Sequence, residues 1–187
     1  KRLLKLAADD GHATAAFNYG QILLDERPNT AGIKAALPYF EMAADQQIAD
    51  AYYALAQIYR TGKLNGYAEN ETAQEWLLKA AKAGVDTAQV ELAIWLANGT
   101  GGIEDPKNAF AWMSRAALGG NVIARNRLAK MYAQGIGTKV DPVEAAKWHI
   151  LAQRAGLNDS WLDDFIAAID RAQLAKALEA ANRWPSG

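Results

Sequence analysis

A period of 36 to 37 residues runs through this chain of 187 residues and limits the folds that it can adopt. Aromatic residues, alanines and glycines each return at this interval. The clearest columns are Tyr39, Trp76, Trp112 and Trp148; Ala51, Ala88 and Ala124; Gly62, Gly99 and Gly135; and Gly84, Gly120 and Gly156, with Gly11 and Gln47 at the same phase earlier in the chain. Columns that keep the same phase predict a repeat architecture, in which each unit packs only on its neighbours.

Each repeat is predicted to contain two helices. In the best-formed unit, the apolar and small residues of 124–132 fall on one helical stripe, and Gly135 is placed to end this helix. Asp141 followed by Pro142 predicts the start of a second helix, and Glu144 would complete a capping box. No segment alternates apolar and polar residues for long enough to form a strand, so the predicted fold class is all-α.

The residue types of the columns suit close stacking of helices. The alanine column lets neighbouring helices approach, and the aromatic column is predicted to fill the space between successive units as part of the core. A core position for Trp112 would make its replacement by alanine cost about 3–5 kcal/mol of folding free energy.

Composition and charge weigh against several functions. A formal net charge of −1 gives no long-range field, so we expect no nucleic-acid partner and no binding to an anionic membrane surface. No apolar run reaches the roughly 18 residues that a membrane crossing needs. The chain has no cysteine, which excludes disulfides and is compatible with any compartment, so no localisation is predicted. The sequence does not predict an oligomeric state either. Residues 1–8 read as the second half of an amphipathic helix, so we expect the chain to be cut from a longer one.

Candidate catalytic and metal-binding residues are few. His12 and His149 lie in different units, and neither has the three or four convergent ligands that a metal ion needs. The Gly-x-Gly sequences at 99–101 and 135–137 follow a helix and lack the rest of a phosphate-binding fingerprint. The sequence therefore predicts no catalytic residue, no metal site and no cofactor, and it does not favour an enzyme.

The stretch 124–138, with its Gly135-Ile136-Gly137-Thr138 loop, and the stretch from Asp141 to Trp148 resemble the Sel1-like repeat, a relative of the tetratricopeptide repeat. This resemblance implies a right-handed α-solenoid of helix–turn–helix repeats closed by a C-terminal pair of capping helices. The expected repeats span residues 1–8 (partial), 9–44, 45–81, 82–117 and 118–157, and the capping helices span 158–187, the first opened by a capping box at Ser160–Asp163.

The resemblance also implies where a partner binds. The second and sixth residues after the first alanine of each opening helix face away from the predicted buried stripe, and in tetratricopeptide-like arrays this face lines a concave groove. The predicted groove residues at these positions are Phe17, Gln21, Tyr53, Gln57, Val90, Ile94, Asn126 and Lys130. Arg60, the ninth residue after Ala51, is predicted to lie on the same face. Aromatic and aliphatic side chains flanked by amides and cations suit a protein or peptide partner. The alternative is that curvature buries some of them.

Three functions remain open at this stage. The first is a non-enzymatic interaction scaffold that holds a partner segment in the groove. The second is a regulatory or cell-envelope sensor domain of a longer signalling protein, which fold analogy does not separate from the first. The third is a hydrolase, because cysteine-rich Sel1-like proteins have been described as hydrolases. The absence of cysteine here weighs against that analogy.

Overall fold

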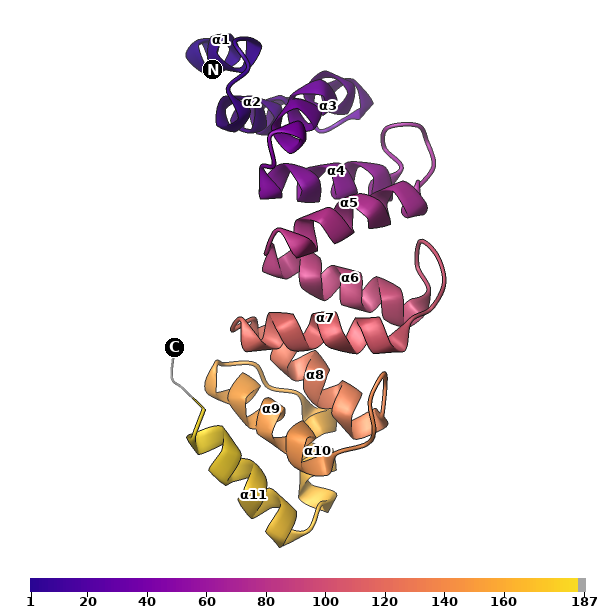
Figure 1. Ribbon diagram of the computed structural model, residues 1–187, viewed down its shortest axis with the longest axis vertical. Helices are drawn as coiled ribbons and strands as arrows, with labels where there is room; N and C mark the ends of the chain where they lie inside the picture. Colours follow the sequence, from indigo (N-terminus) through magenta and orange to yellow (C-terminus); the bar gives the residue numbers. More distant parts are fainter. Residues whose placement is uncertain (185–187) are drawn as a thin grey trace. The chain divides into compact units, whose positions relative to one another are not determined.

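The computed structural model describes residues 1–184, and within them the chain forms eleven α-helices and no strand (Figure 1). Residues 185–187 of the predicted capping segment lie outside the described residues. The helices are α1 (Arg2–Asp9), α2 (Ala13–Glu26), α3 (Thr30–Asp45), α4 (Ala49–Thr61), α5 (Asn70–Lys82), α6 (Asp86–Asn98), α7 (Pro106–Leu118), α8 (Val122–Gln134), α9 (Pro142–Arg154), α10 (Ser160–Ala168) and α11 (Arg171–Asn182). The all-α prediction is confirmed.

The chain divides into two compact units at a point within α6. The first unit contains residues 1–89 and 100–102, and the second contains residues 90–99 and the described residues from 103 onward. In the first unit α2 packs on α3 and α4 on α5, around a core that includes Phe40 and Leu55. In the second unit α8 packs on α7 and α9, and α11 packs along α9, around a core that includes Leu128 and Trp148.

Acidic and amide side chains begin several of these helices. Asp141 accepts hydrogen bonds from the backbone N–H groups of Val143 and Glu144, both at 3.0 Å, which satisfies two donors that a helix start leaves unpaired. The reciprocal half of the predicted capping box does not form. The N–H of Asp141 donates to the carbonyl of Tyr132 at 3.0 Å, and the Glu144 carboxylate accepts from the indole of Trp148 at 3.1 Å instead.

The start of α10 also differs from the prediction. Asp159, rather than Ser160, is the N-cap, and its carboxylate accepts from the N–H of Leu162 at 3.3 Å. The prediction chose the hydroxyl of a Ser-x-x-Asp pattern, whereas the carboxylate one residue earlier is an equally good N-cap type. This one-residue difference matters for the second unit, because Asp159 also contacts α8.

Residues in the left-handed conformation follow the second helix of each repeat. Gly11, Gln47, Gly84, Gly120 and Gly156 have φ angles of 89°, 63°, 94°, 97° and 90°. Glycine adopts this region without the steric cost that a Cβ brings, so the glycine column of the sequence marks a backbone requirement. Gln47 adopts the same left-handed backbone conformation although it carries a Cβ atom.

This column gives a test in which backbone conformation alone decides the result. A Cβ added at Gly84 would meet no atom within 4 Å, so Gly84→Ala carries a conformational cost without a clash. We expect it to lower the free energy of unfolding by about 1–2 kcal/mol, and Gln47→Gly to leave it unchanged or raise it slightly. Urea denaturation measures both, and equal losses in the two variants would contradict this explanation of the column.

The aromatic column is less uniform than predicted. Trp148 is 3% exposed, whereas Tyr39, Trp76 and Trp112 are only half-buried. Trp148 is covered because the ring of Trp184 packs edge-on against it, with 5.0 Å between centroids. The Lys79 ammonium lies 3.9 Å from the ring centroid of Trp76, and the Arg115 guanidinium lies 5.5 Å from that of Trp112. Trp112 packs against the core of the second unit but stays partly exposed, so the prediction that it is a core residue holds only in part.

Candidate functional site

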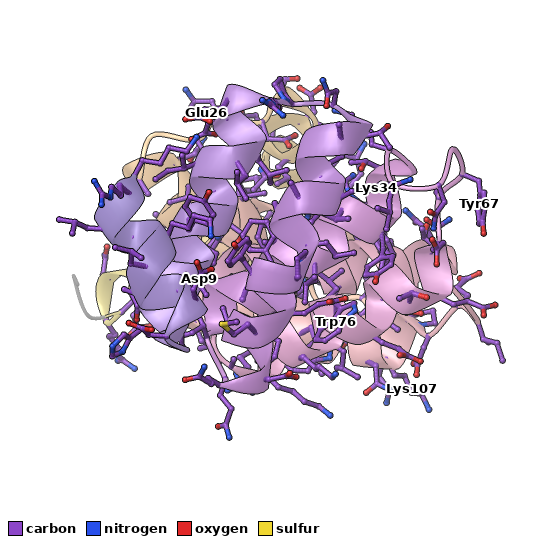
Figure 2. All side chains as sticks on the ribbon, turned by 90° about the horizontal axis from the view of Figure 1, so that it is seen from above. Asp9, Glu26, Lys34, Tyr67, Trp76 and Lys107 are labelled. Atoms are coloured by element: carbon purple, nitrogen blue, oxygen red, sulfur yellow. The ribbon has the colours of Figure 1, made fainter. Side chains whose placement is uncertain are left out.

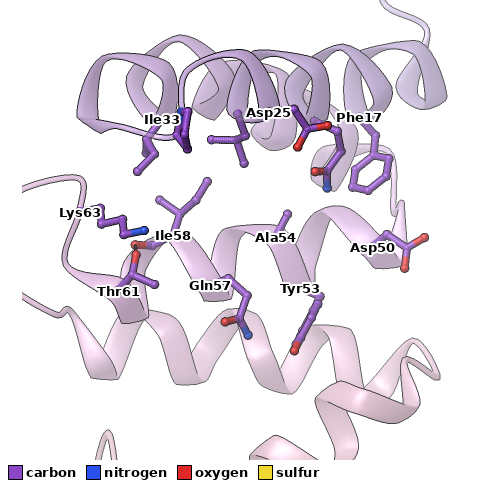
Figure 3. A pocket seen from close by; sticks show the side chains of 13 residues that line it. Phe17, Asp25, Ile33, Asp50, Tyr53, Ala54, Gln57, Ile58, Thr61 and Lys63 are labelled. Atoms are coloured by element: carbon purple, nitrogen blue, oxygen red, sulfur yellow. Dashed lines mark hydrogen bonds between the residues drawn. The ribbon is translucent and has the colours of Figure 1, made fainter.

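A pocket of about 550 Å³ lies between α2 and α4 in the first unit (Figure 3). These helices open two successive repeats. The lining residues are Phe17, Gln21, Leu24 and Asp25 of α2; Asp50, Tyr53, Ala54, Gln57, Ile58 and Thr61 of α4; Ile33 of α3; and Pro28 and Lys63 of the connecting loops. The structure thus brings four of the predicted groove residues, from two different helices, to one concave site.

Helical periodicity explains why these side chains share the pocket. Phe17, Gln21 and Leu24 are spaced i, i+4, i+7 and fall on one face of α2, and Ala54, Ile58 and the other lining residues of α4 recur with the same spacing. Figure 3 shows Ala54 and Ile58 pointing from α4 towards α2, whereas Tyr53 and Gln57 point the other way in this view. The pocket therefore has an aliphatic floor between the helices and a polar and aromatic rim along α4.

Contacts within the first unit hold both the floor and the rim in place. Ile33 and Ile58 are each 5% exposed, so the floor is continuous with the core. The Phe17 ring packs edge-on against the buried ring of Phe40, with 5.8 Å between centroids. The Arg60 guanidinium donates to Oε1 of Gln57 at 2.5 and 3.0 Å, which fixes the orientation of that amide. Arg60 itself does not line the pocket.

The loop between α4 and α5 forms one end of the pocket. The Thr30 hydroxyl at the start of α3 donates to the carbonyl of Lys63 at 2.8 Å, so the loop is tied to the helix opposite. Tyr67, further along the same loop, is 65% exposed and projects away from the helices (Figure 2). The loop thus contributes Lys63 to the pocket and presents Tyr67 to solvent.

The predicted groove residues of the second unit lie in different surroundings. Ile94 and Lys130 line a smaller pocket of about 200 Å³. Val90 and Asn126 are 8% and 7% exposed, so the expectation that they face solvent is corrected. For Val90 the reason is that α6 buries a wider stripe than predicted, since Ala88, Gln89 and Val90 are consecutive buried residues. For Asn126 the reason is a contact with a later part of the chain.

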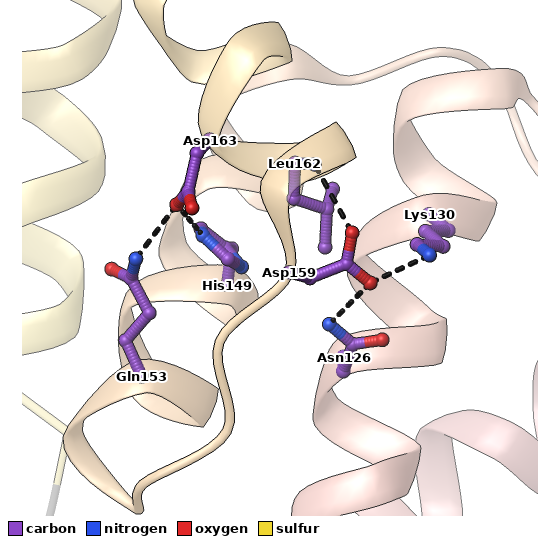
Figure 4. Close-up of polar contacts among 7 residues, drawn as sticks. All are labelled: Asn126, Lys130, His149, Gln153, Asp159, Leu162 and Asp163. Atoms are coloured by element: carbon purple, nitrogen blue, oxygen red, sulfur yellow. Dashed lines mark hydrogen bonds and ion pairs between the residues drawn. The ribbon is translucent and has the colours of Figure 1, made fainter.

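That contact is a cluster of polar groups around Asp159 (Figure 4). The Asn126 amide donates to Oδ2 of Asp159 at 3.1 Å, and the Lys130 ammonium lies 2.6 Å from the same oxygen. Partial burial by itself would raise the pKa of Asp159, but the hydrogen bonds from Lys130, Asn126 and the Leu162 N–H outweigh it and hold that pKa below its ordinary value. The carboxylate is therefore ionised at neutral pH.

Sequence reasoning missed Asp159 as a contact residue. The pairing of Asp159 with Asn126, 33 residues earlier in the chain, follows from tertiary structure alone.

His149 forms a second polar contact in the same region. It is fully buried, and its Nε2 lies 2.7 Å from Oδ1 of Asp163, which also accepts from the Gln153 amide at 2.8 Å (Figure 4). His12 is exposed at the start of α2. Among residues 1–184, no group of three or more histidine or carboxylate side chains is arranged to hold a metal ion. No helix in this part of the chain has both the length and the apolar character to cross a bilayer.

Comparison with known proteins identifies relatives of the chain. The model of the Sel1 repeat family matches four consecutive segments, residues 13–47, 49–85, 86–121 and 122–157. These segments begin at or beside the first residues of α2, α4, α6 and α8. No curated protein matches the chain.

Two solved structures are similar over most of the chain. A Sel1 repeat protein from Oxalobacter formigenes is 30% identical with a TM-score of 0.75, and the match covers 89% of this chain and 48% of that protein. The protein c5321 of uropathogenic Escherichia coli, described as a protective antigen displaying an SLR fold, is 25% identical with a TM-score of 0.59. That match covers 97% of this chain and 47% of c5321. The chain spans about half the length of each of these two proteins.

Proposed function

Because the chain belongs to the Sel1 repeat family and has its α-solenoid fold, we propose that it is a non-enzymatic scaffold that holds a segment of a partner protein. Sel1 repeats generally mediate interactions between proteins. The observation that supports a particular site is the pocket between α2 and α4, which is built from the opening helices of two successive repeats. We also propose that α10 and α11 cap the repeat array at its C-terminal side.

The chemistry of the pocket suits a peptide with an apolar anchor. A volume of about 550 Å³ accommodates large side chains, and the aliphatic floor formed by Ile33, Ala54 and Ile58 would exclude water from them. The Gln21 amide can donate and accept hydrogen bonds, and the Gln57 amide nitrogen can donate while its oxygen accepts from Arg60, which suits the backbone groups of a bound segment. Tyr53 at the rim is a residue type that often dominates binding energy at protein interfaces.

The proposal predicts that a charge in the floor weakens peptide binding. Peptides selected from a phage-displayed library against the full chain should bind Ala54→Glu at least about tenfold more weakly, because a carboxylate in the aliphatic floor must be desolvated. Tyr53→Ala should weaken the same peptides by about 2 kcal/mol, the usual effect at an interface anchor. Fluorescence anisotropy with labelled peptides measures both.

Ala35→Glu is the matched control for this experiment. Ala35 is exposed on α3 in the same unit and does not line the pocket, so the same substitution there should leave binding unchanged. Circular dichroism melts of all three variants should stay close to that of the original chain. Selected peptides that bind Ala54→Glu as tightly as the original chain would place the binding surface elsewhere and contradict the proposal.

A further inference from the structure

In the second unit, residues 157–163 lie on the face of α8 that corresponds to the rim of the pocket between α2 and α4. Asn126 and Lys130 are the second and sixth residues after Ala124, as Tyr53 and Gln57 are after Ala51. The two α8 side chains lie one helical turn apart, and both contact the same carboxylate oxygen of Asp159. The segment 157–163 therefore occupies this face as a ligand would.

Polar contacts and one core side chain hold this segment. Between residues 157 and 170, Leu162 is the only fully buried side chain. Asp159 is held by α8, and Asp163 is held by His149 and Gln153 of α9. Trp161 remains 42% exposed, and its ring stacks on that of Phe165 with 5.9 Å between centroids. Hydrogen bonds and ion pairs of this kind exchange readily with those of a competing ligand, since their net contribution is modest.

The helix that follows is anchored separately from the segment. The Arg154 guanidinium donates to the carbonyl of Ala181 at 3.1 Å and to the side chain of Asn182 at 2.6 Å. The contact between Trp148 and Trp184 adds an aromatic pair between α9 and the end of α11. Release of residues 157–169 would therefore leave α11 docked on α9.

We propose that α8 carries a carboxylate-binding site, which the chain fills with its own Asp159, and that an acidic segment of a partner protein displaces residues 157–163 from it. The ligand is defined by the contacts of the present occupant. One carboxylate oxygen of Asp159 contacts both the Lys130 ammonium and the Asn126 amide. The other oxygen accepts a hydrogen bond from the backbone N–H of Leu162, three residues later in the chain. A matching partner carries an aspartate at a helix start with an aliphatic residue three positions later.

This site shares no residue with the pocket between α2 and α4. The two proposals therefore stand or fail separately, and the variants that test them are different.

The test uses the full chain and a synthetic peptide that copies residues 156–168. In the original chain the site is filled, so labelled peptide should bind weakly. Asp159→Asn removes the charge of the internal occupant, and we expect this variant to bind the peptide at least about tenfold more tightly in fluorescence anisotropy. Adding Lys130→Met, which keeps the aliphatic stem but not the charge, should abolish that gain. A peptide with asparagine at the position of Asp159 should also lose it.

A second measurement examines displacement in the original chain. Amide hydrogen exchange in residues 160–166 should be at least about tenfold faster than in α8 and α9, because the segment opens without global unfolding. Three results would each overturn the proposal: a folded Asp159→Asn variant that binds no peptide, equal binding with and without Lys130, or exchange in the segment as slow as in α8. A collapsed melt for Asp159→Asn would also overturn it, since the segment would then be a permanent part of the fold.

Discussion

Replacement of Trp148 by alanine should lower the free energy of unfolding by about 3–5 kcal/mol, the range for a buried tryptophan truncated in a packed site. The indole is 3% exposed and packs against Trp184. Its Nε1 donates to the Glu144 carboxylate at 3.1 Å, so truncation removes a hydrogen bond as well as apolar contact. Urea denaturation followed by circular dichroism measures the loss.

Trp112→Ala is the matched control for this prediction, because the same residue type stands at the same phase of the repeat. The ring of Trp112 is half-buried and partly covered by Arg115, so we expect a smaller loss of about 1–2 kcal/mol. Equal losses of unfolding free energy in the two variants would show that the contact with Trp184 adds nothing to the stability that Trp148 provides.

The second large effect is expected at Gly137, in the loop between α8 and α9. Its φ angle is 69°, and a Cβ there would lie 1.9 Å from the carbonyl oxygen of Pro106 and 2.8 Å from Cβ of Phe110. Gly137→Ala therefore requires the loop to move away from the start of α7, and we expect a loss of more than about 3 kcal/mol in the free energy of unfolding.

Gly156→Ala separates this clash from the cost of the backbone conformation. Gly156 also has a positive φ angle, 90°, but a Cβ at that position would meet no atom within 4 Å. Its replacement should cost only about 1–2 kcal/mol. If thermal melts show the same shift for both variants, the close approach of Gly137 to Pro106 has no energetic consequence. The expected difference assigns the second glycine of the Gly-x-Gly loop a packing role.

The period of the sequence predicts the helices well because caps, glycines and apolar stripes are local signals. Asp105 and Asp141 start helices where predicted, since an N-cap depends on groups within three residues. Phe17 and Tyr53 reach one pocket because equivalent positions on successive opening helices lie near each other. What periodicity predicts is therefore the relation between neighbouring repeats.

Features that depend on distant parts of the chain could not be predicted in this way. The half-buried state of Trp112 and the full burial of Trp148 differ because only the latter meets Trp184. Asn126 has the phase of a groove residue, but a carboxylate from beyond the repeats covers it. The contact between Asp159 and Asn126 leaves no trace in the spacing of residues within one repeat.

The contact between Trp148 and Trp184 has a consequence for the order in which the second unit assembles. Helices of one repeat meet over short sequence separations, so they can pair as soon as both have left the ribosome. Trp184 lies 36 residues after Trp148, and α11 lies between 17 and 40 residues after the helix on which it docks. The part of the Trp148 indole that Trp184 covers therefore stays exposed until α10 and α11 have been synthesised. Docking of α11 on α9 then buries this apolar surface.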